Sequence, residues 1–366
     1  MPGLRSLLFC LMLACAQLLH AKQLYEQDVS ASDRYRVEQA KELDAYILAL
    51  RADKSRLHAL FHPDYSSQAA FVRSSKALRR TFSQSIGYPP PTGPITETSS
   101  FTKMGEDDLG TYYRAVIPVL SGVHAEGIYI VPKGLKGKAP LVISMHGGGG
   151  SPEVALFHGG ANYHDMVRGA VRRGYVVFAP QHLFSAPGFP PDIRNQTDDR
   201  LRLVGTSLTA VEIAKITRSL DVLVKRPEVD PSRIAMVGLS YGGYYALVVP
   251  ALEPRIKVAV SSCYFGVQEF RYEADERSIP SDFRFPDRFT LFRDPEIAAL
   301  ICPRALMIQA GQSDDAPHRD MGIRLSPEAA AYYKGLGMGE RFEFVLCPGG
   351  HEFDDASAWD FVKKYL

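Results

Sequence analysis

The chain has almost no net charge, because its 42 Lys and Arg residues are matched by 41 Asp and Glu residues, which leaves a formal charge of +1. Nucleic acids and other acidic polymers attract basic surfaces, so we expect no nucleic-acid partner. The sequence also lacks an apolar run long enough to span a membrane, and it contains no internal repeat or low-complexity tract. Its hydrophobic fraction of 46% and charged fraction of 23% are those of an ordinary globular protein.

Cysteine is scarce as well: there are five in the chain, and two of them, Cys10 and Cys15, stand near its start. The other three, Cys263, Cys302 and Cys347, are an odd number and cannot all pair with one another. Cys302 and Cys347 lie in or beside apolar runs, which favours buried thiols over a disulfide. No C-x-x-C or H-E-x-x-H motif occurs, so we expect no metal site and no cofactor.

The first residues have the pattern of a signal peptide. Arg5 precedes the apolar run Leu7–Leu19, which is too short for a membrane span and ends in small residues up to Ala21. This pattern predicts a signal peptide over residues 1–21 and a secreted or periplasmic protein. Met12–Cys15 matches a lipoprotein box only poorly, which leaves a lipid anchor as an alternative.

The remaining chain divides into two parts by its periodicity. Residues 22–98 predict a helical arm: apolar residues recur at helical spacing within 33–86, and the proline-rich segment Tyr88–Pro94 forms a stiff connector. Residues 99–366 predict the catalytic domain, which starts with an antiparallel pair of strands at 111–117 and 127–131.

Short apolar runs then alternate with helical stretches such as 206–225. Runs of this kind are typical of parallel strands that are buried on both faces. Alternating strands and helices predict an α/β protein with a mostly parallel, doubly wound sheet. The runs are Leu141–Met145, Val176–Ala179, 234–237, 258–260, 305–308 and Arg341–Leu346.

The most informative motif follows the apolar run 234–237. It reads Gly238-Leu239-Ser240-Tyr241-Gly242, a G-x-S-x-G pattern, and the apolar stretch after it can continue as a helix. Strand, serine turn and helix together are typical of a nucleophile elbow, in which the serine sits on a strained turn. Gly238 and Gly242 provide the space that this turn needs. We therefore predict Ser240 as the nucleophile.

A second glycine-rich segment, His146–Gly150, directly follows the run that ends at Met145. Glycine leaves backbone N–H groups accessible, and one such donor to a developing oxyanion is typically worth ~3 kcal/mol. A phosphate-binding loop would require a following Lys-Ser or Lys-Thr pair, which is missing. We predict an oxyanion hole formed by the N–H groups of Gly148 and Tyr241.

The acid and the base of a triad should follow later strands. The turn Gly311–Pro317 offers Asp314 and Asp315; we choose Asp314, with Asp315 as the alternative. His351 stands in the loop after the final apolar run, from where it can reach back over the sheet. The order Ser240, Asp314, His351 is the one found in α/β-hydrolases. For His182, which also follows a strand, pocket lining and surface packing both remain open.

These motifs resemble those of a known superfamily. The sequence is similar to α/β-hydrolases from about residue 100 to the end, and closest to their dienelactone-hydrolase-like, acetylxylan-esterase-like and prolyl-oligopeptidase-like branches. The nucleophile here is serine, whereas dienelactone hydrolases proper use cysteine, and no β-propeller precedes the domain as in the oligopeptidases. The similarity rests on His146–Gly149, Pro227–Ile234, Gly238–Gly243, Cys302–Leu306 and Gly349–Phe353.

An insertion at about 264–295 is rich in aromatic residues and falls where hydrolases carry cap elements. It can form an aromatic-lined pocket or sugar platform, or it can simply pack as a cap. Its aromatic residues are Phe265, Phe270, Tyr272, Phe283, Phe285, Phe289 and Phe292.

Taken together, the sequence predicts a secreted serine hydrolase that cleaves carboxylic esters without a metal or cofactor. The substrate is a small-molecule or oligosaccharide ester; an acetylated carbohydrate is implied by the resemblance and by secretion. A serine peptidase of the prolyl-oligopeptidase-like type is one alternative. A non-catalytic binding protein on a hydrolase scaffold is another.

Overall fold

The structure is a computed structural model that describes residues 24–158 and 162–366. It contains two compact units, one that ends at Asp53 and one that comprises Lys54–Leu366. The predicted signal peptide, residues 1–21, lies outside the described residues.

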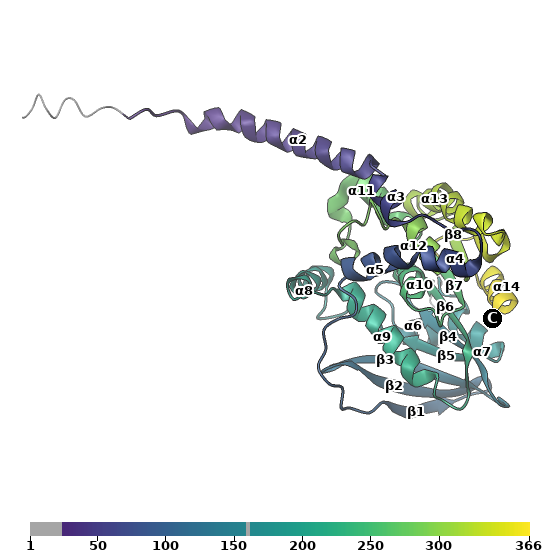
Figure 1. The fold of residues 1–366 in the computed structure, drawn as a ribbon. Coiled ribbons are helices and arrows are strands. Elements are labelled where there is room, and N and C mark those ends of the chain that lie inside the picture. The colour runs from purple at the N-terminus through teal and green to yellow at the C-terminus, as the bar shows by residue number, and fades with distance from the viewer. Residues whose placement is uncertain (1–23, 159–161) are drawn as a thin grey trace, which may run out of the picture. The chain divides into compact units, whose positions relative to one another are not determined.

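The described part of the first unit is a short 3₁₀ turn, η1 (Val29–Ser32), followed by the helix α2 (Asp33–Ala52) (Figure 1). The first part of the stretch 33–86, for which the sequence predicts helix, is thus the helix α2. None of the residues of α2 is buried.

The second unit is built on one sheet, which has nine strands in its described residues (Figure 1). The strand order is β1-β2-β3-β5-β4-β6-β7-β8-β9. Strands β1 to β3 are antiparallel, β3 pairs antiparallel with β5, and the other neighbours are parallel. The predicted α/β class with a mostly parallel sheet is confirmed. The strands are β1 (Ser100–Glu106), β2 (Gly110–Leu120), β3 (Val123–Pro132), β4 (Ala139–Met145), β5 (Val176–Pro180), β6 (Val229–Leu239), β7 (Val258–Ser262), β8 (Ala305–Gly311) and β9 (Phe342–Cys347).

Helices cover both faces of this sheet, and the central strands explain why. Every residue of β4 is buried; Leu141 and Ile143 belong to the core on one face, and Val142 belongs to the core on the other. Successive strand residues point to opposite faces, so a continuous apolar run needs cover on both. The first face is covered by α5 (Lys76–Ser85), α9 (Leu208–Leu223), α10 (Tyr241–Leu252), α12 (Asp294–Ile301) and α13 (Ala316–Gly335). The second is covered by α6 (Pro152–Phe157), α7 (Met166–Arg172) and α14 (Asp355–Tyr365).

Four further helices complete the second unit. They are α3 (Ser55–Leu60), α4 (Gln68–Ser74), α8 (Pro191–Leu203) and α11 (Val267–Asp275). Three 3₁₀ turns lie at η2 (Glu276–Ser278), η3 (Ser281–Phe283) and η4 (Gly339–Arg341).

Much of the predicted helical arm belongs to this second unit. From Lys54 onward its helices pack into the hydrophobic core of the sheet's first face. Phe82 on α5 is fully buried, with its ring centroid 5.3 Å from that of Phe292 and 5.8 Å from that of Phe285. Arg79 on the same helix donates to the carbonyl oxygens of Ala251 and Leu300. These helices are therefore part of the unit that carries the sheet.

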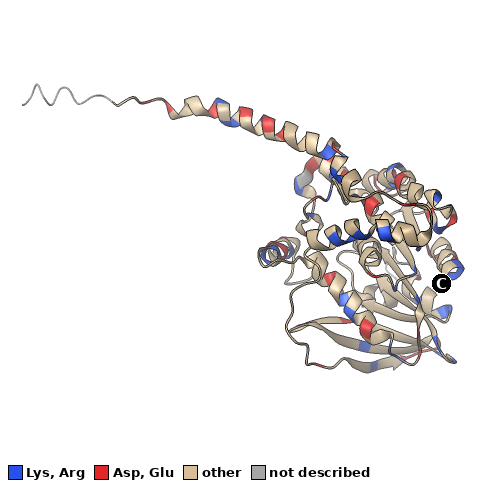
Figure 2. Cartoon of the chain, viewed as in Figure 1, with Lys and Arg blue, Asp and Glu red and all other residues tan. Residues whose placement is uncertain are grey.

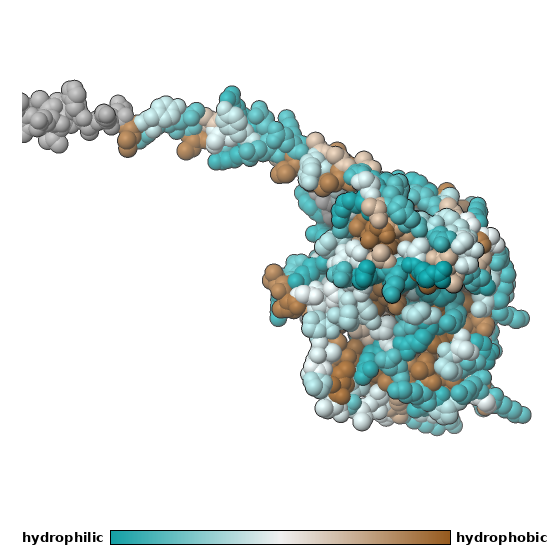
Figure 3. All heavy atoms as spheres, viewed as in Figure 1, coloured by the Kyte–Doolittle hydropathy of each residue, from teal (hydrophilic) through white to brown (hydrophobic). Residues whose placement is uncertain are grey.

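The surface carries both charge signs. Lys and Arg are interspersed with Asp and Glu along α9 and, separately, along α2 (Figure 2). On the face shown in Figure 3, hydrophobic side chains form small patches between hydrophilic ones. No helix among the described residues combines the length and the apolar character that a membrane span requires.

The packing of α5 leads to a first prediction. Phe82→Ala removes a fully buried ring between two other rings, and such a truncation typically lowers the free energy of unfolding by about 3–5 kcal/mol. Denaturation in urea measures this value. Gln84→Ala, at an exposed position of the same helix, is the control and should change it by less than about 0.5 kcal/mol. Equal stabilities of the two variants would contradict the packing.

Candidate active site

Ser240 stands on the turn between β6 and α10, the context expected of a nucleophile elbow. Its backbone angles, φ 58° and ψ −116°, lie in a strained region for a residue with a side chain. A Cβ added at Gly238 would lie 2.2 Å from the Gly242 carbonyl oxygen, and one added at Gly242 would lie 2.2 Å from the Met145 carbonyl oxygen. The two glycines are therefore required by the close approach of the backbone.

Asp314 and His351 meet at the same edge of the sheet. Asp314 follows β8 and His351 follows β9, which pair in parallel and so end side by side. His351 Nδ1 lies 2.9 Å from Asp314 Oδ2. Burial acts to raise the pKa of Asp314, but the hydrogen bond and charge of His351 outweigh it, so this pKa lies below its usual value. The structure thus holds Asp314 as a carboxylate bonded to the imidazole.

Asp315 has a different environment from Asp314. Its side chain is 62% exposed, and it caps α13 by accepting a hydrogen bond from the backbone N–H of His318. Asp314 is only 7% exposed. The structure therefore brings Asp314, and not Asp315, to His351.

Ser240 opens into a pocket of about 200 Å³ near this pair. The described residues provide no hydrogen bond between the Ser240 hydroxyl and His351. Catalytic hydrogen bonds are often long before substrate binds, so this geometry is compatible with a serine–histidine pair. The pocket is lined by Gly148, Phe184, Ser240, Tyr241, Cys263, Tyr264, Val267, Gln268, Arg271, Pro280, Phe283 and His318.

Both residues predicted for the oxyanion hole line this pocket. The N–H of the preceding residue, Gly147, is occupied because it donates to the Tyr163 hydroxyl at 2.8 Å. The Gly148 N–H has no acceptor among the described residues, and a Cβ at this position would lie 2.9 Å from the Phe184 ring. Tyr241 is the first residue of α10, where an N–H has no acceptor within the helix. Two backbone donors thus remain free beside Ser240.

His318 belongs to the site but was not among the predicted residues. Its ring packs edge-on against His351, with centroids 4.5 Å apart, and its Nδ1 bonds Asp315. Burial is the main cause that lowers the pKa of His318. The sequence shows His318 at the start of a helical stretch, four residues after Asp314, but without a strand before it. Only the fold places it in the pocket.

Two further histidines lie behind the glycine-rich segment. The rings of His146 and His182 stack with centroids 3.8 Å apart, and the His182 Nε2 bonds the His146 carbonyl oxygen. Both are 1% exposed, so His182 neither packs at the surface nor lines the pocket. Burial lowers the pKa of His146 to about 4 and that of His182 well below its usual value. These rings are neutral supports of the segment and are not candidates for the base.

Cys263 is buried next to the acid and the base. Its Sγ donates to the carbonyl oxygens of Gly350 and Glu352, at 3.9 and 3.5 Å, and its pKa is raised by burial and by the charge of Asp314. All three described cysteines are free and buried, as expected for Cys302 and Cys347. The potential ligand atoms of Cys263, Asp314 and His351 lie within 4.8 Å of one another, and so do those of Asp314, Asp315 and His318. In both groups the hydrogen bonds above already pair a histidine with a carboxylate.

The aromatic insertion serves mainly as packing. Of its aromatic residues, Phe283 and the first residue, Tyr264, line the pocket, and the others pack in or against the core. The insertion is anchored internally by a buried ion pair, in which Arg288 Nη2 lies 2.5 Å from Asp294 Oδ1. Asp294 also accepts the N–H of Gly266 through its other oxygen, at 2.6 Å.

Comparisons with known proteins agree with the predicted fold. The chain matches the Dienelactone hydrolase family over residues 128–283, a segment that includes the glycine-rich segment, the elbow and part of the insertion. The chain has the α/β-hydrolase fold. A relative from Bacillus subtilis (strain 168), named "Putative hydrolase YtaP", is 27% identical over 263 residues, which cover 66% of this chain and 84% of the relative.

Solved structures show the same fold. A protein from Bacteroides fragilis NCTC 9343, named a "putative acetyl xylan esterase", superposes with a TM-score of 0.67 at 16% identity, covering 83% of this chain and 82% of its own. A "Glucuronoyl Esterase" from Solibacter usitatus gives a TM-score of 0.62 at 14% identity, covering 81% and 93%. The family match bears out the predicted resemblance to dienelactone-hydrolase-like members, and the solved structures share the fold of acetyl xylan esterases. The matches support the predicted class of carboxylic-ester hydrolase.

The neutral histidines lead to a prediction on pH. The folded-state pKa of His146, about 4, lies below the unfolded value of about 6.5, so between these values the unfolded chain takes up a proton that the fold excludes. The free energy of unfolding should therefore fall as pH drops from 6.5 to 4, by up to about 3 kcal/mol from this residue.

Urea denaturation at several pH values between 7 and 4 tests this slope. His146→Gln removes one of the two titrating rings and should make the slope shallower, while the part from His182 remains, whatever the effect on stability at pH 7. His62→Gln, at an exposed position, is the control and should leave the slope as it is in the unmodified chain. An unchanged slope in His146→Gln would refute the assignment.

Proposed function

We propose that the chain is a serine hydrolase that cleaves carboxylic esters through an acyl-enzyme, with Ser240, His351 and Asp314 as its triad. The observation that supports this most is the Asp314–His351 hydrogen bond at the sheet edge where Ser240 stands strained on its elbow. The alternative acid, Asp315, caps a helix and bonds His318. Three residues distant in sequence thus supply a nucleophile, a base and the group that orients the base.

In the proposed mechanism the Ser240 hydroxyl oxygen attacks the ester carbonyl while His351 Nε2 takes its proton. Asp314 holds the proton on His351 Nδ1, which leaves Nε2 as the acceptor, and stabilises the imidazolium that forms. The carbonyl carbon becomes tetrahedral and its oxygen becomes an oxyanion, which the N–H groups of Gly148 and Tyr241 would receive. His351 then returns the proton to the departing alcohol, and water releases the acyl group by the same steps.

The substrate class and the location of the protein extend this proposal. Structural neighbours are named acetyl xylan esterase and glucuronoyl esterase, and on this basis we propose an ester of a carbohydrate, such as an acetylated oligosaccharide. A secreted or periplasmic location fits such a polymer-derived substrate. It is supported by the apolar run Leu7–Leu19 of the sequence.

The nucleophile is tested by labelling with a fluorophosphonate. The unmodified chain should be labelled at Ser240 and should hydrolyse small acetyl esters. Ser240→Ala should remove the label and lower kcat by several orders of magnitude, while its circular dichroism spectrum stays unchanged. Persistent labelling at another serine of this variant would contradict the assignment.

The acid is tested by a matched pair of neighbouring variants. Asp314→Asn keeps the shape of the side chain but removes the charge that fixes the His351 tautomer, so kcat should drop on the order of 10⁴-fold. Asp315→Asn retains a capping oxygen for α13 and should change kcat by less than about threefold. The reverse result would make Asp315 the acid.

A further inference from the structure

The pocket beside Ser240 contains a buried amide that has no hydrogen-bond partner. Gln268, the second residue of α11, is 2% exposed and lines the pocket. Its Oε1 is buried and has no hydrogen-bond partner among the described residues. Leaving a buried polar group unpaired typically costs about 1–3 kcal/mol, so such a group in a native site calls for a ligand.

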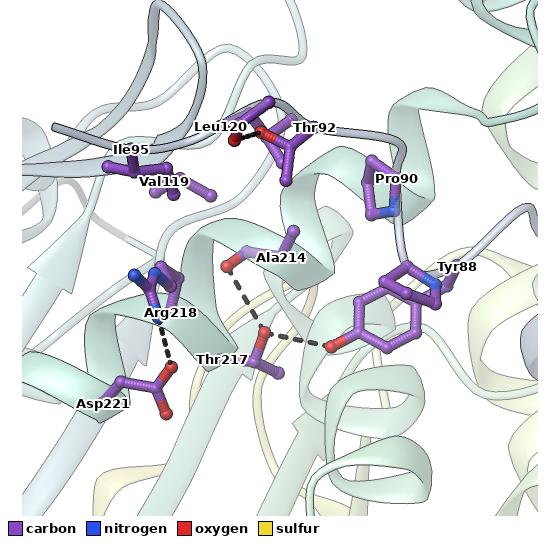
Figure 4. Close-up of a pocket in the computed structure, with 12 residues that line it drawn as sticks. Tyr88, Pro90, Thr92, Ile95, Val119, Leu120, Ala214, Thr217, Arg218 and Asp221 are labelled. Carbon is purple, nitrogen blue, oxygen red and sulfur yellow. Dashed lines mark hydrogen bonds and ion pairs between the residues drawn. The ribbon is translucent and has the colours of Figure 1, made fainter.

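A second and larger pocket serves as a comparison, because its polar side chains are paired. It measures about 440 Å³ and lies between the Pro-rich connector, the end of β2 and α9 (Figure 4). The Tyr88 hydroxyl lies 3.1 Å from that of Thr217, and Arg218 lies 3.2 Å from Asp221. Its polar side chains therefore bond one another. Only the smaller pocket combines an unpaired amide with the nucleophile.

Two neighbours make the surroundings of Gln268 polar on one side. Arg271 lies one turn further along α11 and also lines the pocket. His318 bonds Asp315 through Nδ1, and its Nε2 has no partner among the described residues. If Nδ1 carries the proton that Asp315 accepts, Nε2 is a free acceptor. Phe184 and Phe283 form an apolar wall of the same pocket.

Tyr264 also lines the pocket and has a buried hydroxyl without a hydrogen bond, but this hydroxyl has a charged neighbour. The Arg288 guanidinium is close to it and acts on its pKa.

We propose that Gln268 determines substrate specificity: its amide binds a hydroxyl group that the substrate carries close to the scissile ester, with His318 as a second acceptor. An amide offers a donor and an acceptor together, and a hydroxyl group can satisfy either. An ester with only hydrocarbon on both sides would leave the amide unpaired. The pocket measures only about 200 Å³, so the hydroxyl belongs to a small group. This inference rests on the proposed esterase function.

The hydroxyl can belong to the alcohol or to the acyl part, and two substrate pairs distinguish these sources. The alcohol-side pair is 2-hydroxyethyl acetate and propyl acetate; the acyl-side pair is ethyl glycolate and ethyl propionate. In each pair a methyl group replaces the hydroxyl at nearly constant volume. We expect kcat/KM to favour the hydroxyl member by about 10- to 100-fold in one pair.

Gln268→Met is the test variant, because methionine has the length of glutamine but forms no comparable hydrogen bond. It should reduce that preference to less than about threefold while Ser240 is still labelled by a fluorophosphonate. The Tm of the free variant should be unchanged or higher, since an unpaired buried amide has been removed. A purely structural role would lower Tm and leave the preference intact. Glu273→Gln, on the exposed side of α11, is the control and should keep both.

The outcomes separate the inference from the function on which it rests. Labelling and acetate hydrolysis without a hydroxyl preference in either pair would overturn the role of Gln268 and leave the esterase proposal standing. A preference that survives in Gln268→Met would do the same. Absence of both labelling and ester hydrolysis in the unmodified chain would overturn the function and the inference with it.

Discussion

The site depends on backbone segments that approach one another more closely than any side chain permits. A Cβ at Gly242 would meet the Met145 carbonyl oxygen at 2.2 Å, and one at Gly311 would meet the Gly350 carbonyl oxygen at 1.9 Å. The first contact joins the turn at Ser240 to the end of β4, and the second joins the loop of Asp314 to the loop of His351. Parallel strands bring the loops at their carboxyl ends to one edge of the sheet. Glycine, which has no Cβ, lets the backbones of these loops approach closely enough for their functional side chains to meet.

Buried polar groups then hold the walls of the pocket. The Tyr241 hydroxyl donates to Asp282 Oδ2 at 2.6 Å, and Arg194 lies 3.7 Å from the other oxygen while its guanidinium stacks on Phe184. Burial raises the pKa of Asp282, whereas the charge of Arg194 acts against it. This network ties Tyr241, which follows the proposed nucleophile, to the insertion, so the position of one proposed oxyanion donor and that of the pocket wall are coupled.

The sequence predicted what depends on local pattern. Apolar runs such as Leu141–Met145 identified the central strands, and the glycines around Ser240 identified the turn. The choice of Asp314 over Asp315 agrees with the hydrogen bond to His351, although neighbouring aspartates cannot be told apart by pattern. His318 and Gln268 could not be found in this way, because their neighbours in the pocket are distant in sequence. The sequence also did not show where the arm ends, because its contacts with the sheet are distant in sequence. Packing shows that its helices from Lys54 onward belong to the unit that carries the sheet.

The insertion has two functions that its composition does not separate. Its aromatic residues bury area and, with the Arg288–Asp294 pair, fix its fold on the core. On α11, Gln268 lines the pocket and its Oε1 is left without a partner, at a cost to stability that the anchored framework tolerates. Rigid anchoring matters because a mobile glutamine would turn to solvent and pair with water. Held in place, it can hydrogen-bond a substrate without first losing conformational freedom, which is how a small pocket discriminates between ligands of equal volume.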